Sequence, residues 1–161
     1  MLSSLASAGI SQTVEAPADE SVVAVVEETA ALPEADDASP GIILPAAETD
    51  LADWLWIRRP IVVFADSPAD PRFIEQMELL NARLDVLLER DVVILTDTDP
   101  AQRSSVRREL RARGFMLVIM AKDGTIVARK PAPWDVREIS RSIDKLPLRQ
   151  QEIRDRRSGT R

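Results

Sequence analysis

The sequence of 161 residues contains no cysteine, no histidine and no tyrosine. The missing cysteine excludes disulfides, thiolate catalysis, iron–sulfur clusters and zinc sites with thiolate ligands. The missing histidine removes both the usual general base and the commonest ligand of transition metals. Any chemistry of this chain therefore depends on Asp, Glu, Lys, Arg, Ser or Thr side chains, and we expect no bound cofactor.

Basic residues are also missing, but only from the first third of the chain. Residues 1–53 hold 11 of the 27 acidic residues and neither Lys nor Arg, whereas the remainder carries 16 acidic and 21 basic residues. The apolar fraction of 45% and the charged fraction of 30% are typical of a globular protein. We therefore predict an acidic arm followed by a mildly basic domain.

The predicted arm covers residues 1–49, which are rich in Ala, Glu, Asp and Pro and contain no aromatic residue. This composition cannot bury enough apolar surface to offset the entropy of ordering, so we predict a disordered linker. Ala6-Ser7-Ala8 has the small-x-small form of a signal-peptidase site, which makes residues 1–8 a candidate signal-peptide remnant. We expect a periplasmic or secreted protein if the true start lies upstream, and a cytoplasmic one otherwise. We expect no transmembrane segment, because no run is long enough to cross a bilayer.

The rest of the chain alternates between apolar runs and amphipathic segments. Residues 61–65 and 92–95 are continuous apolar runs, which are typical of strands covered on both faces. Residues 71–88 place apolar side chains at steps of three and four, which predicts a helix. A second helix is predicted over residues 100–114, because Pro favours a helix start and Gly a helix end.

The second half adds a hairpin and two helices. Residues 115–120 form a third apolar run, and Asp123-Gly124 predicts a tight turn into a strand at 125–129. Helices are expected over residues 134–144 and 148–157. The order βαβ, linking helix, ββα is that of the thioredoxin fold, since right-handed crossovers place the first two strands side by side and parallel. We therefore predict an α/β, thioredoxin-like protein with a four-stranded mixed sheet and helices on both faces.

Four blocks of the sequence resemble one known family. They are Trp56-Ile57-Arg58-Arg59-Pro60 with the apolar run after it, Glu89-Arg90-Asp91, Lys122-Asp123-Gly124, and residues 143–154. The last block, I-D-x-L-P-L-R-x-Q-E, is the most specific. Together they resemble the DUF4174 domain over residues 50–157, with 158–161 as a tail; Ala121 departs from the Gly that the family often has there. The resemblance implies a thioredoxin-like fold and a bacterial exported protein, and it implies no reaction.

Polar side chains gather where the first two strands are expected to end. Asp66, Ser67 and Asp70 follow the first strand, and Asp97 and Asp99 follow the second. Ligands of open α/β sheets favour this edge, so one interpretation is a carboxylate-based enzyme or a Mg²⁺ or Ca²⁺ site. The other is structural, because Asp70 and Asp99 each precede a proline and have the form of a helix cap.

The turn at residues 66–70 stands where a thioredoxin carries its Cys-x-x-Cys pair. Without a thiol, disulfide exchange is impossible, and a nucleophilic Ser67 would need Lys or a carboxylate as its base. We therefore predict a non-catalytic binding or scaffold module with no catalytic, cofactor or metal residues. Its expected partner is an envelope protein or a peptide, and Trp134 is a further candidate for the partner surface.

Arg103, Arg107 and Arg111 are spaced by four residues within the second predicted helix. Like charges at this spacing repel each other, which favours an anion-binding surface that offsets them. The alternative is a solvated helix face whose arginine stems cover apolar surface. Nucleic acid is not an expected partner, because no aromatic side chains are interleaved with the arginines.

Overall fold

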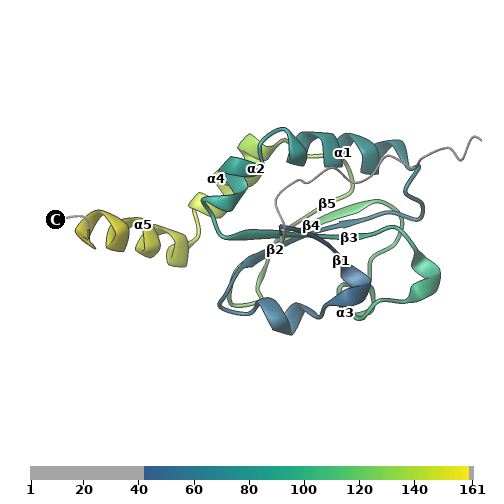
Figure 1. The fold of residues 1–161 in the computed structure, drawn as a ribbon, viewed down its shortest axis with the longest axis horizontal. Coiled ribbons are helices and arrows are strands. Elements are labelled where there is room, and N and C mark those ends of the chain that lie inside the picture. Colours follow the sequence, from purple (N-terminus) through teal and green to yellow (C-terminus); the bar gives the residue numbers. More distant parts are fainter. Residues whose placement is uncertain (1–41, 160–161) are drawn as a thin grey trace, which may run out of the picture. The chain divides into compact units, whose positions relative to one another are not determined.

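The computed structural model describes residues 42–159, which form a five-stranded mixed sheet with helices on both faces (Figure 1). Most of the predicted linker, including residues 1–8, lies outside these described residues. The strand order is β1-β3-β2-β4-β5. Three strands are parallel: β1 (Ile43–Pro45), β3 (Val92–Asp97) and β2 (Arg59–Phe64). β4 (Met116–Met120) runs antiparallel to β2, and β5 (Ile126–Lys130) antiparallel to β4, as the hairpin prediction required.

The prediction of four strands is wrong, because β1 adds a fifth at the edge beside β3. It pairs in parallel with residues 94–96 and lies within the segment that composition assigned to the linker. Three residues are too few to show a strand period in the sequence. The strand is therefore defined by its pairing with β3, and the 3₁₀ helix η1 (Ala46–Glu48) that follows buries Ala46.

Helices cover both faces of the sheet (Figure 1). One face carries α1 (Pro71–Asn81), α2 (Leu84–Leu88) and α4 (Val136–Asp144), and the other carries α3 (Ser105–Leu110), η1 and η2 (Leu51–Trp54). Ile61 and Val63 pack on the first face, whereas Val62 and Phe64 pack on the second. All four are fully buried, which explains why β2 is apolar at consecutive positions.

The first two predicted helices are each divided into shorter pieces. The helix expected over residues 71–88 is divided at Arg83, whose φ of −141° and ψ of 39° are not helical. The helix expected over residues 100–114 consists of a 3₁₀ turn, η3 (Pro100–Gln102), and the six-residue α3. Arg103 and Arg111 flank α3, and both have left-handed backbone conformations, with φ of 46° and 52°.

The last helix, α5 (Pro147–Gly159), extends away from the sheet in Figure 1. Arg149 is buried at its root, whereas residues 154–159 are exposed. Among the helices of residues 42–159, none combines the length and the apolar character that crossing a membrane requires.

Candidate functional site

A buried ion pair joins the carboxyl ends of the two central parallel strands. Asp97 ends β3, and its Oδ1 accepts hydrogen bonds from Nε and Nη2 of Arg107 at 3.0 and 2.8 Å. Each of the two residues is only 7% exposed. Nη2 of Arg107 also donates to the carbonyl oxygens of Ala65 and Asp97 at 2.6 and 3.0 Å. One guanidinium therefore ties the ends of β2 and β3 to α3.

The second carboxylate oxygen of Asp97 is engaged by Ser104. The Ser104 hydroxyl donates to Oδ2 at 2.5 Å and accepts the backbone N–H of Arg107 at 3.0 Å, which caps α3. Both carboxylate oxygens of Asp97 thus accept hydrogen bonds from within the fold. They are the atoms that a metal ion or a substrate would have to contact here.

Asp70 and Asp99 act as caps. Asp70 accepts the backbone N–H of Arg72 at 2.9 Å at the start of α1, and Asp99 accepts that of Ala101 at 2.9 Å at η3. Hydrogen bonds from the side chain and backbone of Arg72 lower the pKa of Asp70 below its usual value. Within residues 42–159, no group of three or more Asp or Glu side chains is placed to hold a metal ion.

Asp66 and Ser67, in the turn after β2, are both exposed. The Asp66 side chain is 63% exposed, and its Oδ1 lies 3.5 Å from Nη1 of Arg107. Ser67 Oγ accepts the backbone N–H of Ala69 at 3.1 Å, as in a turn. The structure thus brings Asp66 and Asp97 to one arginine, and it gives Ser67 a turn contact.

The five polar candidates do not line one cavity. Asp66, Ser67 and Asp70 line an open hollow of about 440 Å³, and Asp97 and Asp99 line another of about 130 Å³. The predicted clustering of carboxylates at this edge is therefore divided between two surfaces.

Trp134 is half-buried beside α1. Its backbone N–H donates to Oε1 of Gln76 at 2.7 Å, and Nε2 of Gln76 donates to its carbonyl oxygen at 3.1 Å. The Lys130 ammonium lies 4.4 Å from the centre of the indole ring. These contacts fix Trp134 against a fully buried glutamine, and it shares neither hollow with the polar candidates.

The three arginines do not form the predicted stripe. Arg103 and Arg111 lie outside α3, at its two ends, and both are exposed. Arg107 is buried in the pair with Asp97, because its guanidinium reaches inward to the strand ends. A continuous face of positive charge on this helix is therefore a wrong prediction.

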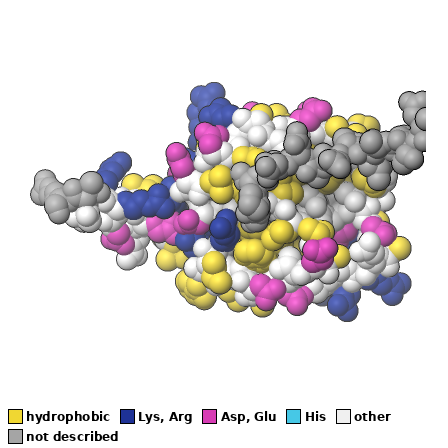
Figure 2. Space-filling view, in the orientation of Figure 1, with side chains coloured by type: hydrophobic (Ala, Val, Ile, Leu, Met, Phe, Trp, Pro, Cys, Tyr) yellow, Lys and Arg dark blue, Asp and Glu magenta, His cyan; other side chains and the backbone are white. Residues whose placement is uncertain are grey.

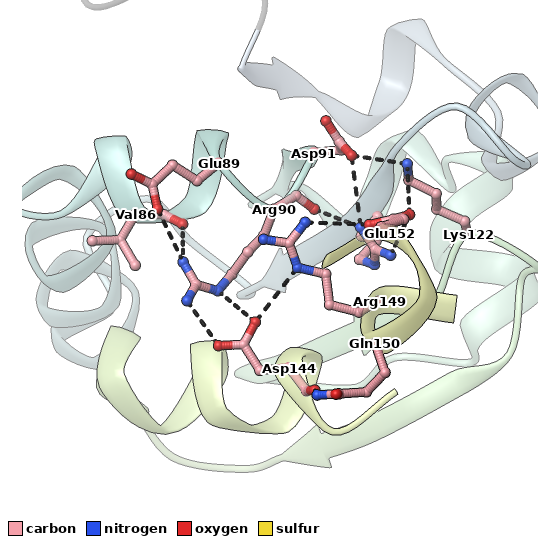
Figure 3. A network of polar contacts seen from close by, with 10 residues as sticks. Val86, Glu89, Arg90, Asp91, Lys122, Asp144, Arg149, Gln150 and Glu152 are labelled. Carbon is pink, nitrogen blue, oxygen red and sulfur yellow. Dashed lines mark hydrogen bonds and ion pairs between the residues drawn. The ribbon is translucent and has the colours of Figure 1, made fainter. Parts of the chain in front are cut away.

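A second charged network, which sequence analysis missed, lies at the opposite end of the parallel strands, where β2 and β3 begin (Figure 3). Arg59, the first residue of β2, is 1% exposed and donates to Glu152 of α5 at 2.9 Å and to the Arg90 carbonyl at 2.7 Å. Lys122 Nζ lies 2.9 Å from Asp91 and 3.1 Å from Glu152. Both cations thus converge on the root of α5.

The network extends to the end of α4. Nε and Nη2 of Arg90 donate to Asp144 at 3.1 and 2.8 Å, and Arg149 lies 3.2 Å from Glu152 and 3.5 Å from Asp144 (Figure 3). Burial alone would raise the pKa of Glu152, but the hydrogen bonds from Arg59, Lys122 and Arg149 outweigh it and lower this pKa from 4.5 to about 2. Glu152 is therefore ionised throughout the neutral range and anchors α5.

The charged residues of this network all lie in the four sequence blocks that resemble the family, and this was the one sign of them in the sequence. Arg59, Arg90, Asp91 and Lys122 belong to three of them, and Asp144, Arg149 and Glu152 to the fourth. These residues are spread over almost a hundred positions, so their spacing gives no hint of contact. The sheet brings them together because β2 and β3 begin at the same edge.

The parallel β2–β3 pair, the β4–β5 hairpin and the thiol-free turn after β2 define a thioredoxin-like protein without redox cysteines. Several solved structures are similar in fold, among them the following two. Reduced 2-Cys peroxiredoxin from Plasmodium vivax aligns with a TM-score of 0.53 and 13% identity, covering 64% of this chain and 85% of that one. Plasmodium yoelii thioredoxin peroxidase I aligns with a TM-score of 0.51 and 16% identity, covering 64% and 80%.

The sequence matches the family described as a domain of unknown function, DUF4174, over residues 50–152. The chain belongs to this family, which confirms the predicted membership and the thioredoxin-like fold. No curated protein matches the sequence.

Proposed function

We propose that this protein is a non-catalytic binding or scaffold module. The observation that carries the proposal is the buried Arg107–Asp97 pair at the edge where α/β sheets usually bind their ligands. Asp70 and Asp99 are caps, and Ser104 engages the second oxygen of Asp97. The carboxylates at the ends of β2 and β3 thus cap helices and hold strand ends together. This supports a binding function elsewhere on the surface over a reaction at these residues.

A turnover assay on the full-length protein tests the proposal. Insulin reduction, hydrogen peroxide consumption and hydrolysis of p-nitrophenyl phosphate and p-nitrophenyl acetate are expected to stay at the buffer rate. Asp66→Ala is expected to change stability slightly, since the Asp66 side chain is 63% exposed and solvent screens its ion pair with Arg107. Measurable turnover that disappears in Asp66→Ala or Ser67→Ala would contradict the proposal and favour a carboxylate-based enzyme.

The anion-binding alternative is tested separately. Arg103 and Arg111 are the exposed members of the predicted set, so Arg103→Ala with Arg111→Ala leaves the buried Arg107 pair intact. We expect no salt-sensitive binding to vesicles of phosphatidylglycerol. Binding that the double variant abolishes would support the alternative.

We also propose that the protein acts in the bacterial envelope. Ala6-Ser7-Ala8 has the form of a signal-peptidase site, and the family resemblance includes exported proteins. Fractionation of the native cells, followed by N-terminal sequencing, is expected to give a periplasmic or secreted protein cleaved after Ala8. Recovery from the cytoplasm with an uncleaved N-terminus would contradict this.

A further inference from the structure

Exposed apolar side chains gather around Lys122, on the side where β2 begins. Seven large hydrophobic residues of the described chain are exposed, and four of them line three hollows that all include Lys122: Leu55, Trp56, Ile126 and Leu148. The hollows measure about 120, 400 and 280 Å³. We call these four residues with Lys122 the Trp56 surface. Figure 2 shows hydrophobic side chains next to charged ones beside the root of α5.

Trp56 is the most exposed residue of this surface and has an unfavourable backbone. It is 67% exposed and has a φ of 64°, a left-handed conformation that bulky residues rarely adopt. Its backbone N–H donates to the Lys122 carbonyl at 2.7 Å, which holds it in place. Most of this indole faces water on a disfavoured backbone, and exposed tryptophans at the centre of apolar surfaces often anchor partners.

The base of the Trp56 surface is held by ion pairs and by packing. Lys122 is held by Asp91 and Glu152, and Leu148 lies in α5 next to the buried Arg149. Leu55 rests against the hairpin, where a side chain at Gly124 would come within 3.0 Å of it. A partner that docks here therefore meets side chains that are already ordered, which reduces the entropy lost on binding.

The free charge around the Trp56 surface is negative. Six charged side chains line the three hollows, and two of them, Arg59 and Lys122, form ion pairs with a third, Glu152. The other three form no ion pair with any residue between 42 and 159: Glu109, Asp123 and Asp155. An apolar centre with acidic side chains at its rim complements a segment that is apolar in the middle and basic at its ends.

We infer that the Trp56 surface is a docking site for a polypeptide segment that presents bulky apolar side chains flanked by Lys or Arg. This inference rests on the proposed binding function and gives it a surface and a class of partner. It places recognition at the edge where β2 begins, away from Asp66, Ser67 and Asp70.

The probe is a synthetic peptide, acetyl-KRLFLRK-amide, titrated into the full-length ¹⁵N-labelled protein. Two controls separate the contributions: acetyl-EDLFLDE-amide reverses the flanking charge, and acetyl-KRSGSRK-amide removes the apolar side chains. We expect the first peptide to shift the Trp56 indole N–H signal and to bind at least about tenfold more tightly than either control. Its affinity is expected to fall as salt rises.

Variants locate the site. Trp56→Ala is expected to weaken binding at least about tenfold, and Glu109→Lys with Asp155→Lys is expected to weaken it and remove most of the salt dependence. Ile74→Ala is the matched control, because Ile74 is 46% exposed on α1 and lines none of the three hollows. Dispersed amide spectra of each variant establish that it is folded.

Four results would overturn the inference: no binding of the basic peptide, equal binding of its controls, unchanged affinity in Trp56→Ala, or self-association that Trp56→Ala abolishes. The last result would assign the surface to a second copy of the chain, measured by light scattering after size exclusion. The turnover assays are run on the same preparation. Measurable turnover would contradict the proposed function. No turnover, together with peptide binding that does not depend on Trp56, would contradict only the docking site.

Discussion

Replacing Glu152 with glutamine tests whether the charged network holds α5 to the domain. Glu152 lies 2.9 Å from Arg59, 3.1 Å from Lys122 and 3.2 Å from Arg149. Glu152→Gln keeps the shape of the side chain and removes its charge. Arg59, which is 1% exposed, then loses its closest anionic partner. The variant is therefore expected to be less stable than the wild type at neutral pH.

The size of the loss follows from the pKa of Glu152, which the network lowers from 4.5 to about 2. At about 1.4 kcal/mol for each pKa unit, the full effect would be about 3 kcal/mol. Because a quarter of the side chain is exposed, solvent screens part of the interaction. We expect the free energy of unfolding to fall by about 1 to 2 kcal/mol at pH 7.

The pH dependence of stability has the same origin. The folded-state pKa lies below the unfolded value, so the stabilisation is complete above about pH 4.5 and is lost as the pH falls towards 2. Urea unfolding of both proteins at pH 7, 5, 4 and 3 measures the difference between them. Glu78→Gln is the control, because Glu78 is exposed on α1 and forms no ion pair within residues 42–159.

Two outcomes would refute the reasoning about Glu152. One is a variant as stable as the wild type at pH 7, which would mean that the network contributes nothing net. The other is a difference that stays constant between pH 5 and pH 3, which would assign the loss to packing instead of charge.

Further predictions concern the strand ends, the exposed indole, a cap and metal ions. Arg107→Met leaves Asp97 buried without its partner and is expected to cost about 3 to 5 kcal/mol in urea unfolding, most of which adding Asp97→Leu restores. Trp56→Gly relieves the strain of the left-handed backbone, so it is expected to raise the unfolding free energy by about 1 kcal/mol. The same variant is expected to bind the basic peptide more weakly, and a loss of stability would contradict the prediction. Asp70→Ala removes the cap of α1 and is expected to cost about 1 kcal/mol in the same assay. Millimolar Ca²⁺ or Mg²⁺ is expected to leave the Tm unchanged in a thermal scan, and a rise would favour the metal interpretation.

Much of the fold could be predicted because its signals are local. The apolar runs of β2 and β3 indicate strands covered on both faces, and the Asp-Gly turn marks the hairpin before β5. Asp70 before Pro71 marks the start of α1 for the same reason, since a cap needs only its own turn. The sequence pattern did not indicate β1, because three residues are too few to show a period. It predicted too long a helix around α3, because no local signal marks the left-handed conformations of Arg103 and Arg111.

The sequence by itself determined the absence of thiol and imidazole chemistry, the order of the main strands and helices, and the family. Only the tertiary structure decided which charges meet. Arg107 turns inward to Asp97, and Arg59 meets Glu152 across 93 positions, because a sheet brings together strand ends that the chain keeps far apart. Trp56 stays in water for the same kind of reason, since the exposure of a side chain depends on what packs beside it and not on its own hydrophobicity.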